Sequence, residues 1–440
     1  MIDSLQKRFS LMENGVRGTR TVDKIGSIHK VTGLILESDG PEVTIGQVCT
    51  VSSERHNTEV EAEVVGFSGN NVLLMALDSI HLIHPGCKVI SRKNSNVVPS
   101  GTQLLGRVID GMGRPIDGKG PLHCGYRDGF HSAPPNPLKR NLISEAFSTG
   151  IKSIDSCIPL GLGQRVGVFA GSGVGKSILL GMISRGSSAE VNVISLVGER
   201  GRELREFIEN DLGPEGLSRS VIVVSTSDQP APMRIRASIL ATAIAEGFRD
   251  EGKKVLFMMD SLTRFAMAQR EIGLAAGEPP ASRGYVPSVF SMLPKLLERT
   301  GTNESGAITA IYTVLVEGDD MNEPVADAVR GFLDGHIVLS RKLANANHFP
   351  AVDVLRSVSR LDRAVCNEKE ISMISEIRDL LSVHKQNEDL INVGAYVKGS
   401  NPKIDLSIQK FPLIEKFLRQ RYDQTSNRLS AIQELSEVLS

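Results

Sequence analysis

A glycine-rich stretch from Ala170 to Ser177 combines residue types that bind phosphate. It follows an apolar segment and precedes a helical stretch, so successive backbone N–H groups and the positive end of the helix can face one anion. Lys176 would bring a cation to the β- and γ-phosphates of a nucleotide, and the Ser177 hydroxyl would bind Mg²⁺. The usual first glycine of such loops is Ala170 here, which is tolerable because that position only opens the turn. The predicted nucleotide-binding residues are Gly171, Ser172, Gly173, Val174, Gly175, Lys176 and Ser177.

A single carboxylate, Asp260, ends the apolar run from Val255 to Met259. In an α/β sheet the carboxyl ends of parallel strands line the ligand crevice. An aspartate there can hold Mg²⁺ through the water shell of the ion. Taken alone, Asp260 would equally suit the cap of a helix that starts at Ser261. Together with the glycine-rich loop, Asp260 and Ser177 predict a magnesium site.

Hydrolysis of a nucleotide also needs a positioned water, and Glu199 is a candidate to position it. Glu199 closes the apolar run from Val191 to Val197 and lies 23 residues after Lys176. A carboxylate in this place can orient or deprotonate the attacking water. The neighbouring Arg200 would meet the γ-phosphate. From the residues alone, an N-capping glutamate beside a solvated arginine explains the same pair, so both interpretations stay open at this point.

From Gln164 onward, apolar runs alternate with helical patterns. Nearly continuous apolar runs are typical of parallel strands buried on both faces of a sheet. Between two of them, Leu204, Phe207, Ile208 and Leu212 recur at helical spacing. Alternation of strand and helix predicts a doubly wound α/β domain, which would bring the loop and the carboxylates to one edge of the sheet. The expected strands are Val166–Phe169, Val191–Val197, Val221–Thr226, Val255–Met259 and Ala307–Val316.

The chain between Val22 and Asn96 shows strand patterns instead. Acidic and apolar residues alternate from Glu59 to Val64, and a hairpin turn is expected at Ser68–Asn71. Several such short strands predict a small closed barrel or sandwich. Because aromatic residues are few, the stacking platform of a nucleic-acid-binding barrel is missing, and a structural role is expected.

Two further regions flank the expected α/β domain. The Pro/Gly-rich passage from Gly111 to Pro137 cannot be regular helix or central strand, and it predicts an ordered connector over a surface. After about Val365 the strand patterns stop and charged helical stretches follow. The apolar residues expected along one face of the last helix are Leu429, Ile432, Leu435 and Leu439.

The composition of the 440 residues, 40% hydrophobic and 23% charged, is that of a soluble globular protein. The formal net charge of −1 lacks the basic excess of a nucleic-acid-binding protein. Five cysteines without a CxxC pair argue against a disulfide framework or a zinc site. No apolar run approaches the ~18 residues of a membrane span, and the N-terminus lacks a signal-peptide core. We therefore expect a cytoplasmic protein.

Four motifs together resemble the rotary ATP synthase α/β superfamily. The motifs are Ala170–Ser177, Val197–Glu203, Met259–Arg264 and Pro350–Ser359. The last of these, Pro350–Ser359, is the signature of that superfamily.

Further segments resemble one branch of that superfamily. Ala268–Pro280 and Pro287–Phe290 are similar to the type III protein-export ATPases. Ser227–Ala231 with Met233–Arg234 is more similar to the flagellar branch than to the injectisome branch. The resemblance covers about residues 25 to 400.

The resemblance implies an Mg²⁺-dependent ATPase with a small β-barrel, a RecA-type α/β core and a helical C-terminal domain. It implies that Glu199 is the catalytic carboxylate and that Arg360 is an arginine finger for the γ-phosphate of a neighbouring subunit. Phe349 matches the position whose ring stacks on adenine, where relatives often have tyrosine. From the residue alone, a plain core phenylalanine is the alternative.

The implied function is ATP hydrolysis that drives flagellar protein export. The ATPase would form a homo-hexameric ring, release export substrates from chaperones and deliver them to a membrane export gate, at which the cytoplasmic enzyme would be peripherally bound. An injectisome ATPase shares every catalytic residue and is the first alternative. A hexameric RNA or DNA translocase has a similar core, but neutral charge, no tryptophan and only five tyrosines argue against it. Intact Lys176, Glu199 and Arg360 argue against a ring subunit without turnover.

The extreme N-terminus carries an apolar stripe. Ile2, Leu5, Phe9 and Met12 are spaced for one face of a helix. The stripe would either dock onto the barrel of the same chain or, as the resemblance implies, bind a regulatory partner. The expected division of the chain is 1–21 as this amphipathic partner-binding segment, 22–96 as the barrel, 97–365 as the RecA-type ATPase domain and 366–440 as the helical domain.

Overall fold

The computed structural model describes residues 24–92, 96–316, 318 and 320–440. They form two compact units. One ends at Asn96 and includes residues 275–277, and the other contains Val97–Leu274 and Glu278–Ser440. The amphipathic segment expected at 1–21 lies outside the described residues, so its helical stripe stays a prediction. Among the helices of the described residues, none is long and apolar enough to cross a membrane.

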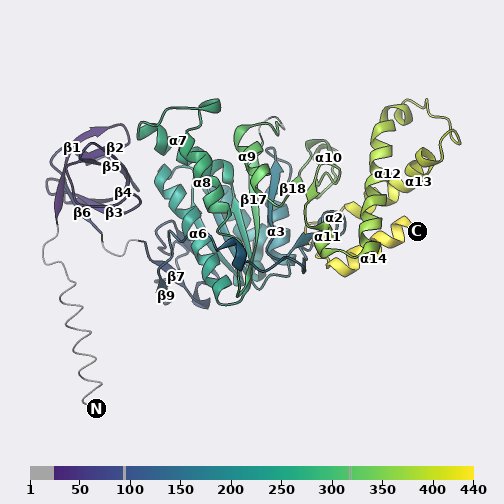
Figure 1. The fold of residues 1–440 in the computed structure, drawn as a ribbon, viewed down its shortest axis with the longest axis horizontal. Coiled ribbons are helices and arrows are strands. Elements are labelled where there is room, and N and C mark those ends of the chain that lie inside the picture. The colour runs from purple at the N-terminus through teal and green to yellow at the C-terminus, as the bar shows by residue number, and fades with distance from the viewer. Residues whose placement is uncertain (1–23, 93–95, 317, 319) are drawn as a thin grey trace, which may run out of the picture. The chain divides into compact units, whose positions relative to one another are not determined.

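The N-terminal strands close into a barrel, in the order β1-β2-β5-β4-β3-β6 (Figure 1). In β4 the side chains of Val60, Ala62 and Val64 are buried while the glutamates between them are partly exposed, as the alternation predicted. The expected hairpin turn joins β4 to β5 at Ser68–Asn71. Within residues 24–92 the strands are β1 (Ile25–Thr32), β2 (Ile35–Ser38), β3 (Val48–Ser53), β4 (Thr58–Ser68), β5 (Asn71–Ala76) and β6 (Lys88–Ser91).

The second unit is built on a central sheet with the order β19-β18-β12-β17-β15-β13-β14-β8. All neighbours in this path are parallel except β19, which is antiparallel to β18. Every expected strand is present, with ends that differ by a residue or so. In the described chain the strands of this sheet are β8 (Arg107–Asp110), β12 (Arg165–Ala170), β13 (Val191–Val197), β14 (Ser220–Ser225), β15 (Lys254–Asp260), β17 (Ala307–Leu315), β18 (Gly335–Val338) and β19 (Val358–Ser359), with β16 (Gly301–Thr302) beside β17.

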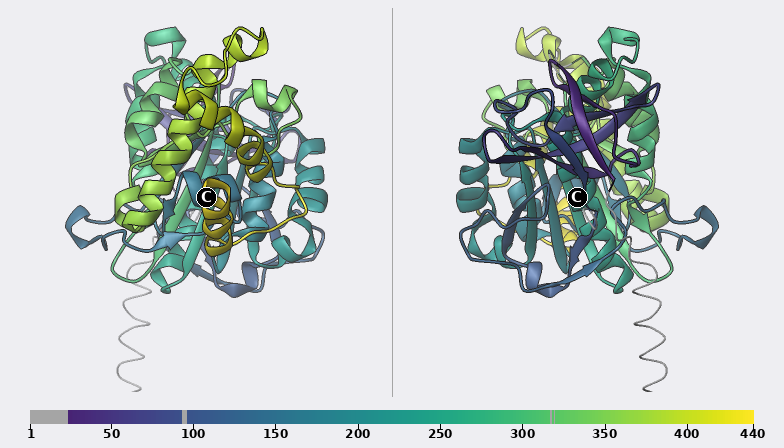
Figure 2. Two further views of the ribbon diagram at one scale, coloured as in Figure 1. Left: turned by 90° about the vertical axis from the view of Figure 1, so that its right-hand side faces the viewer. Right: turned by 90° about the vertical axis from the view of Figure 1, so that its left-hand side faces the viewer.

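Helices cover both faces of this sheet (Figure 2). Met258 belongs to the core that includes Leu180 of α3, whereas the adjacent Phe257 points to the other face of the sheet, where its ring centroid lies 5.7 Å from that of Tyr312 on β17. This two-sided burial is why the strands read as continuous apolar runs. The helical pattern predicted around Leu204 is α4 followed by a π-helix over Phe207–Leu212. The helices before the C-terminal region are α2 (Lys152–Cys157), α3 (Lys176–Gly186), α4 (Gly201–Glu206), α5 (Gly213–Ser218), α6 (Ala231–Asp250), α7 (Leu262–Ala275), α8 (Pro287–Leu297), α9 (Pro324–Phe332), α10 (Arg341–Asn345) and α11 (Asp362–Val365).

The C-terminal region is helical, as predicted, and shares the hydrophobic core of the second unit. Its helices are α12 (Glu368–Asn392), α13 (Pro402–Leu418) and α14 (Arg428–Leu439). The predicted apolar face of α14 is wrong at Leu429, whose surface is 79% exposed. Leu429 lies in the first turn of the helix, and Ala431 and Leu435 are the residues that α14 buries.

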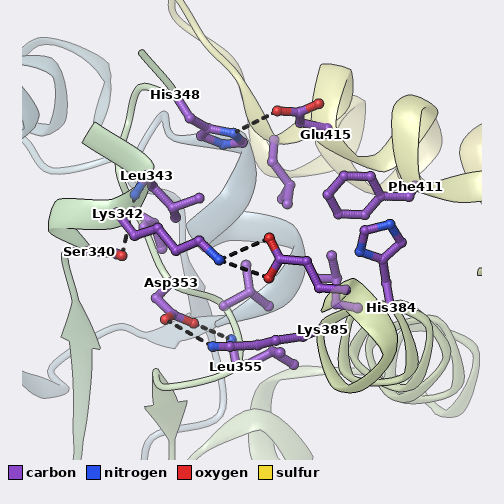
Figure 3. Close-up of a pocket in the computed structure, with 15 residues that line it drawn as sticks. Ser340, Lys342, Leu343, His348, Asp353, Leu355, His384, Lys385, Phe411 and Glu415 are labelled. Carbon is purple, nitrogen blue, oxygen red and sulfur yellow. Dashed lines mark hydrogen bonds and ion pairs between the residues drawn. The ribbon is translucent and has the colours of Figure 1, made fainter. Parts of the chain in front are cut away.

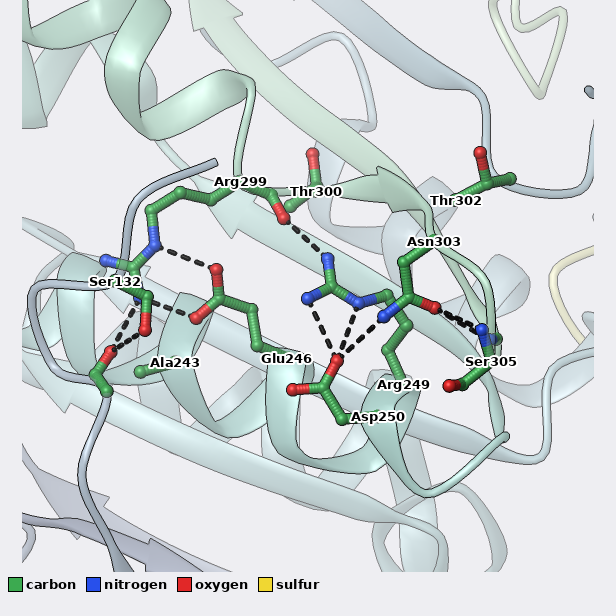
Figure 4. Close-up of polar contacts among 12 residues, drawn as sticks. Ser132, Ala243, Glu246, Arg249, Asp250, Arg299, Thr300, Thr302, Asn303 and Ser305 are labelled. Atoms are coloured by element: carbon green, nitrogen blue, oxygen red, sulfur yellow. Dashed lines mark hydrogen bonds and ion pairs between the residues drawn. The ribbon is translucent and has the colours of Figure 1, made fainter. Parts of the chain in front are cut away.

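The Pro/Gly-rich connector is ordered, as predicted, and contains one short strand, β9 (Gly125–Arg127), paired with β7 (Val98–Ser100). A buried ion pair between Arg299 and Glu246 holds it in place (Figure 4). The same guanidinium donates to the carbonyl oxygens of Phe130 and Gly129 at 2.9 and 3.1 Å. The predicted fold class, a barrel followed by an α/β core with a parallel sheet and a helical C-terminal region, is confirmed.

Candidate active site

A cavity of ≈ 770 Å³ lies at the carboxyl ends of the central strands. The glycine-rich loop follows the last residue of β12, Glu199 follows β13, and Leu315 ends β17. This edge of the sheet is where an α/β domain binds its ligands. The cavity is lined by Ala170, Gly171, Ser172, Gly173, Gly175, Lys176, Ser177, Ile178, Glu199, Arg200, Glu203, Arg264, Leu315, Val316, Gly318, Arg341 and Phe349.

The loop has the backbone conformation that its glycines permit. Gly173 and Gly175 have φ angles of 75° and 87°, in the left-handed region that side chains disfavour. A Cβ atom on Gly175 would also lie 3.2 Å from the ring of Phe349. Helix α3 begins at Lys176 directly after Gly175, and no side chain caps it. Its first N–H groups therefore face the cavity as an anion-binding helix terminus.

Three charged side chains meet beside the loop. The Nζ atom of Lys176 lies 2.5 Å from Oδ1 of Asp260 and 3.4 Å from Oε1 of Glu199. Burial opposes the charge on Lys176, but the two carboxylates outweigh it and raise the pKa of the ammonium group. Burial raises the pKa of Glu199, against the attraction of Lys176 and with the repulsion of Asp260. The lysine is thus held charged, and the glutamate is shifted towards the titration range of a general base.

Asp260 is the last residue of β15, and it is buried. The Thr313 hydroxyl donates to its Oδ1 atom at 2.7 Å. Ser261 rather than Asp260 accepts the N–H of Arg264 in the first turn of α7, so the helix-cap alternative is not supported. Ser177 is exposed and lines the cavity. A hydroxyl and a carboxylate beside the phosphate loop are oxygen donors of the type that Mg²⁺ prefers, so these residues fit the ion.

The structure separates the roles of Glu199 and Arg200. Helix α4 has Arg200 at its N-cap and no side-chain cap, so Glu199 is not an N-capping residue. The Arg200 side chain is 81% exposed and lies 3.2 Å from Glu203. In this conformation Arg200 borders the cavity and is paired with a neighbour on its own helix.

Two arginines in the cavity were not predicted as site residues. Arg341 donates to the carbonyl oxygen of Ser172 at 3.1 Å and so supports the loop. Arg264 packs its side chain against Gly198, where a Cβ atom would lie 2.9 Å from it. Arg264 closes one of the motifs found in the sequence, which is a signal for it. Arg341 carried no such signal, because its contact joins segments 169 residues apart.

Phe349 lies at the border between this cavity and a second one of ≈ 480 Å³. Ile178 and Met182 of α3 line the second cavity on one side, and Arg419–Tyr422 line it from the C-terminal region. The N–H of Gln420 donates to the carbonyl oxygen of Phe349 at 3.0 Å. Phe349 is 38% exposed and therefore is not a plain core residue. A flat base has room beside its ring.

The segment that carries Phe349 is tied to the C-terminal helices around a smaller cavity of ≈ 180 Å³ (Figure 3). Lys342 pairs with Glu388 at 2.8 Å, and His348 lies 3.9 Å from Glu415. These pairs join the α10 segment to α12 and α13. The position of the Phe349 segment is thus coupled to the helical region.

Arg360 is not part of the cavity of its own chain. It follows β19, where Ser359 pairs with Gly335 at the beginning of β18, and its N–H donates to the carbonyl oxygen of Asp334 at 3.0 Å. β18 runs parallel to β12, so Arg360 lies beside the amino end of β12, opposite to the end that carries the phosphate loop. The residue is exposed. The structure therefore brings together the other predicted site residues and separates Arg360 from them.

Three family models match this chain, and together they cover most of its length. Residues 28–93 match the beta-barrel domain of the ATP synthase alpha/beta family, and residues 150–359 match its nucleotide-binding domain. Residues 366–437 match the T3SS EscN ATPase C-terminal domain.

Individual proteins are similar over almost the whole chain. The flagellum-specific ATP synthase of Bacillus subtilis (strain 168) is 55% identical over 92% of this chain and 93% of its own length. The assembled ATPase EscN from the type III secretion system of enteropathogenic E. coli has a TM-score of 0.89 at 42% identity, over 94% of this chain and 100% of that chain. EscN in complex with its central stalk EscO has a TM-score of 0.86 at the same identity and the same coverage.

These similarities extend through the barrel, the nucleotide-binding domain and the helical region, and they confirm the resemblance seen in the motifs. The chain belongs to the ATP synthase alpha/beta family, among its flagellum-specific and type III secretion ATPases.

Proposed function

We propose that this ATPase hydrolyses ATP between two subunits of a homo-hexameric ring. The observation that carries the proposal is the separation of two groups of residues. Lys176, Glu199 and Asp260 meet at the carboxyl end of the sheet, whereas Arg360 is exposed beside its amino end. A finger in this position can serve only the site of another subunit. The assembled form of the similar ATPase EscN supports a ring.

In the proposed reaction a water oxygen attacks the γ-phosphorus, and the bond from this phosphorus to the β–γ bridging oxygen breaks. Glu199 orients the water and accepts its proton, for which its raised pKa suits it. The loop N–H groups and Lys176 hold the phosphates, and Arg200 is available to the γ-phosphate once it leaves Glu203. Mg²⁺, held by Ser177 and Asp260, would neutralise phosphate charge.

Two further contacts complete the site. Phe349 stacks on the adenine, and Arg360 of the neighbouring subunit neutralises charge that develops on the γ-phosphate. An arginine supplied in this way can accelerate phosphoryl transfer by about 10³-fold or more. Its removal should therefore abolish turnover and leave nucleotide binding nearly intact.

Mixed rings test the proposal. Arg360→Ala and Lys176→Ala proteins should each be inactive alone. Mixed and co-assembled, they should regain activity, because some junctions combine an intact loop with an intact finger from the other variant. ATPase activity at several mixing ratios is the measurement, with co-assembly followed by pull-down of a tagged variant. Co-assembled mixtures that stay inactive at every ratio would refute a finger that acts between subunits.

The cellular role that we propose is flagellar protein export. The enzyme would use hydrolysis to release export substrates from chaperones and to deliver them to a membrane export gate, as a cytoplasmic protein bound peripherally at that membrane. A regulatory partner would bind the segment 1–21. Identity of 55% to the flagellum-specific relative of Bacillus subtilis, against 46% to the type 3 secretion system ATPase of Xanthomonas euvesicatoria, favours the flagellar role over the injectisome.

A further inference from the structure

The side chain of Gln164 is fully buried, at 0% exposure, immediately before β12. Its Nε2 group donates to the carbonyl oxygen of Asp334 at 3.0 Å and to the hydroxyl of Ser359 at 3.1 Å. Its Oε1 atom accepts the N–H of Gly161 at 2.8 Å. Both amide hydrogens and the amide oxygen thus have partners, as a buried amide requires.

Both partners of Nε2 hold the backbone of Arg360. Ser359 is the residue before Arg360, and the Asp334 carbonyl oxygen also accepts the Arg360 N–H. The strand that ends at Ser359 has only two residues and lies at the edge of the sheet. So short a strand forms few backbone hydrogen bonds with its neighbour. Hydrogen bonds from side chains therefore contribute more to its position than they do in a long strand.

The residues around the Gln164 side chain leave room for its amide group. A Cβ atom on Gly335 would lie 3.2 Å from Nε2 of Gln164 and 2.7 Å from the carbonyl oxygen of Val358. A leucine in place of Gln164 could not donate to Asp334 or Ser359. A glutamate would turn a carboxylate oxygen towards the Asp334 carbonyl oxygen, which accepts hydrogen bonds only.

We infer that Gln164 is a positioning residue for Arg360: it anchors the backbone from which the guanidinium, which donates to the carbonyl oxygen of Arg330 at 3.4 Å in this chain, reaches the nucleotide of the neighbouring subunit. The inference rests on the proposed function of Arg360. Gln164 lies immediately before β12, and the glycine-rich loop follows the last residue of β12. This one strand therefore connects the anchor of Arg360, which acts on the neighbouring subunit, to the phosphate loop of the same subunit. Without the hydrogen bonds of Gln164, the backbone at Arg360 is held less firmly. Displacement of a catalytic group by about 1 Å can lower the rate of the chemical step by roughly 100-fold.

The test uses Gln164→Leu in the full-length protein. We expect a kcat lower by roughly 100-fold with nucleotide affinity unchanged, because the variant's own phosphate loop is intact. Asn192→Leu is the matched control, since Asn192 is a fully buried amide on β13 that donates to Ser184 and Ser220. It should lower thermal stability without these effects.

Mixed rings distinguish positioning from a general defect. Gln164→Leu mixed with Lys176→Ala should regain activity, because the second variant supplies an intact finger. Mixed with Arg360→Ala it should not, because neither variant supplies one. The opposite pattern would place the defect in the phosphate loop and overturn the inference, as would normal turnover of Gln164→Leu. Normal turnover of Arg360→Ala itself would instead refute the proposed function.

If Gln164→Leu does not fold, Ser359→Ala disturbs the same anchor from the other side, because it removes the hydroxyl that accepts from Nε2 at 3.1 Å. The same rescue pattern is expected for it. Rescue of Ser359→Ala by Arg360→Ala but not by Lys176→Ala would overturn the inference equally.

Discussion

The ammonium group of Lys176 lies 2.5 Å from the carboxylate of Asp260, at the place where the phosphates of a nucleotide are expected. In this arrangement the lysine neutralises a buried carboxylate that would otherwise be costly to keep charged. In the proposed site, a lysine that turned to a phosphate would release Asp260, which could then take part in holding Mg²⁺.

Removal of this lysine should affect binding first. Lys176→Met takes away the cation that the phosphates would engage, and truncation of one partner of a buried charge pair costs about 2–5 kcal/mol. We expect ATP affinity to fall by about 30-fold or more, measured by isothermal titration calorimetry. Lys253→Met, which breaks an exposed ion pair with Glu190, is the control and should leave affinity unchanged. Wild-type affinity of Lys176→Met would contradict the proposed contact.

Glu199→Gln should separate binding from turnover. The amide keeps the size of the side chain but cannot accept the proton, so kcat should fall by about 10²–10⁴-fold while ATP binds normally. Steady-state ATPase assays and nucleotide titration measure the two quantities. Glu206→Gln, an exposed residue of α4, is the control for a change of charge near the site. Turnover of Glu199→Gln near the wild-type rate would remove Glu199 from the catalytic role.

The raised pKa of Glu199 should govern how ATPase activity depends on pH. A general base must be deprotonated, so kcat/KM should fall as the pH drops through the pKa of Glu199. Because burial raises that pKa above the ordinary value of 4.5, the loss should begin at a higher pH than for an exposed glutamate. The acid limb should be absent from the residual activity of Glu199→Gln. A wild-type profile that stays flat down to pH 4.5 would exclude the raised pKa, provided that circular dichroism shows the fold intact.

The aromatic ring of Phe349 should contribute to ATP affinity by stacking on the adenine base. Stacking on an aromatic side chain is worth about 1–3 kcal/mol per base, so Phe349→Ala should raise the KM for ATP by about 5-fold to 150-fold. Phe349→Tyr keeps the ring and should stay near the wild-type value. Phe67→Ala, a change of an exposed barrel phenylalanine, is the control. An unchanged KM for Phe349→Ala would show that adenine binds elsewhere.

The N-terminal segment should serve a partner rather than catalysis. Deletion of residues 1–17 removes the apolar stripe of Ile2, Leu5, Phe9 and Met12. We expect basal ATPase activity to persist while co-purification with the regulatory partner is lost, measured by pull-down of the tagged enzyme. Loss of basal activity or unfolding of the truncated protein would instead assign the stripe to the fold of the enzyme itself.

Much of this architecture was predictable because its signals are local or periodic. The strand before Ala170, the loop and helix α3 are contiguous, so their residue types alone predicted the phosphate site. Glu199 and Asp260 could be placed together because parallel strands end at one edge. The face of α14 was mispredicted at Leu429, because helical spacing defines a stripe but not where along the helix its neighbours begin.

The sequence by itself determined the fold class, the phosphate loop and the carboxylates beside it, since each depends on backbone patterns within one or two elements. Only the tertiary structure decided which groups pair across the chain. Arg341 reaches Ser172 across 169 residues, and Gln164 reaches Ser359 across 195. Such contacts depend on how whole elements pack and which rotamers the packing allows, and no periodicity in the sequence records them.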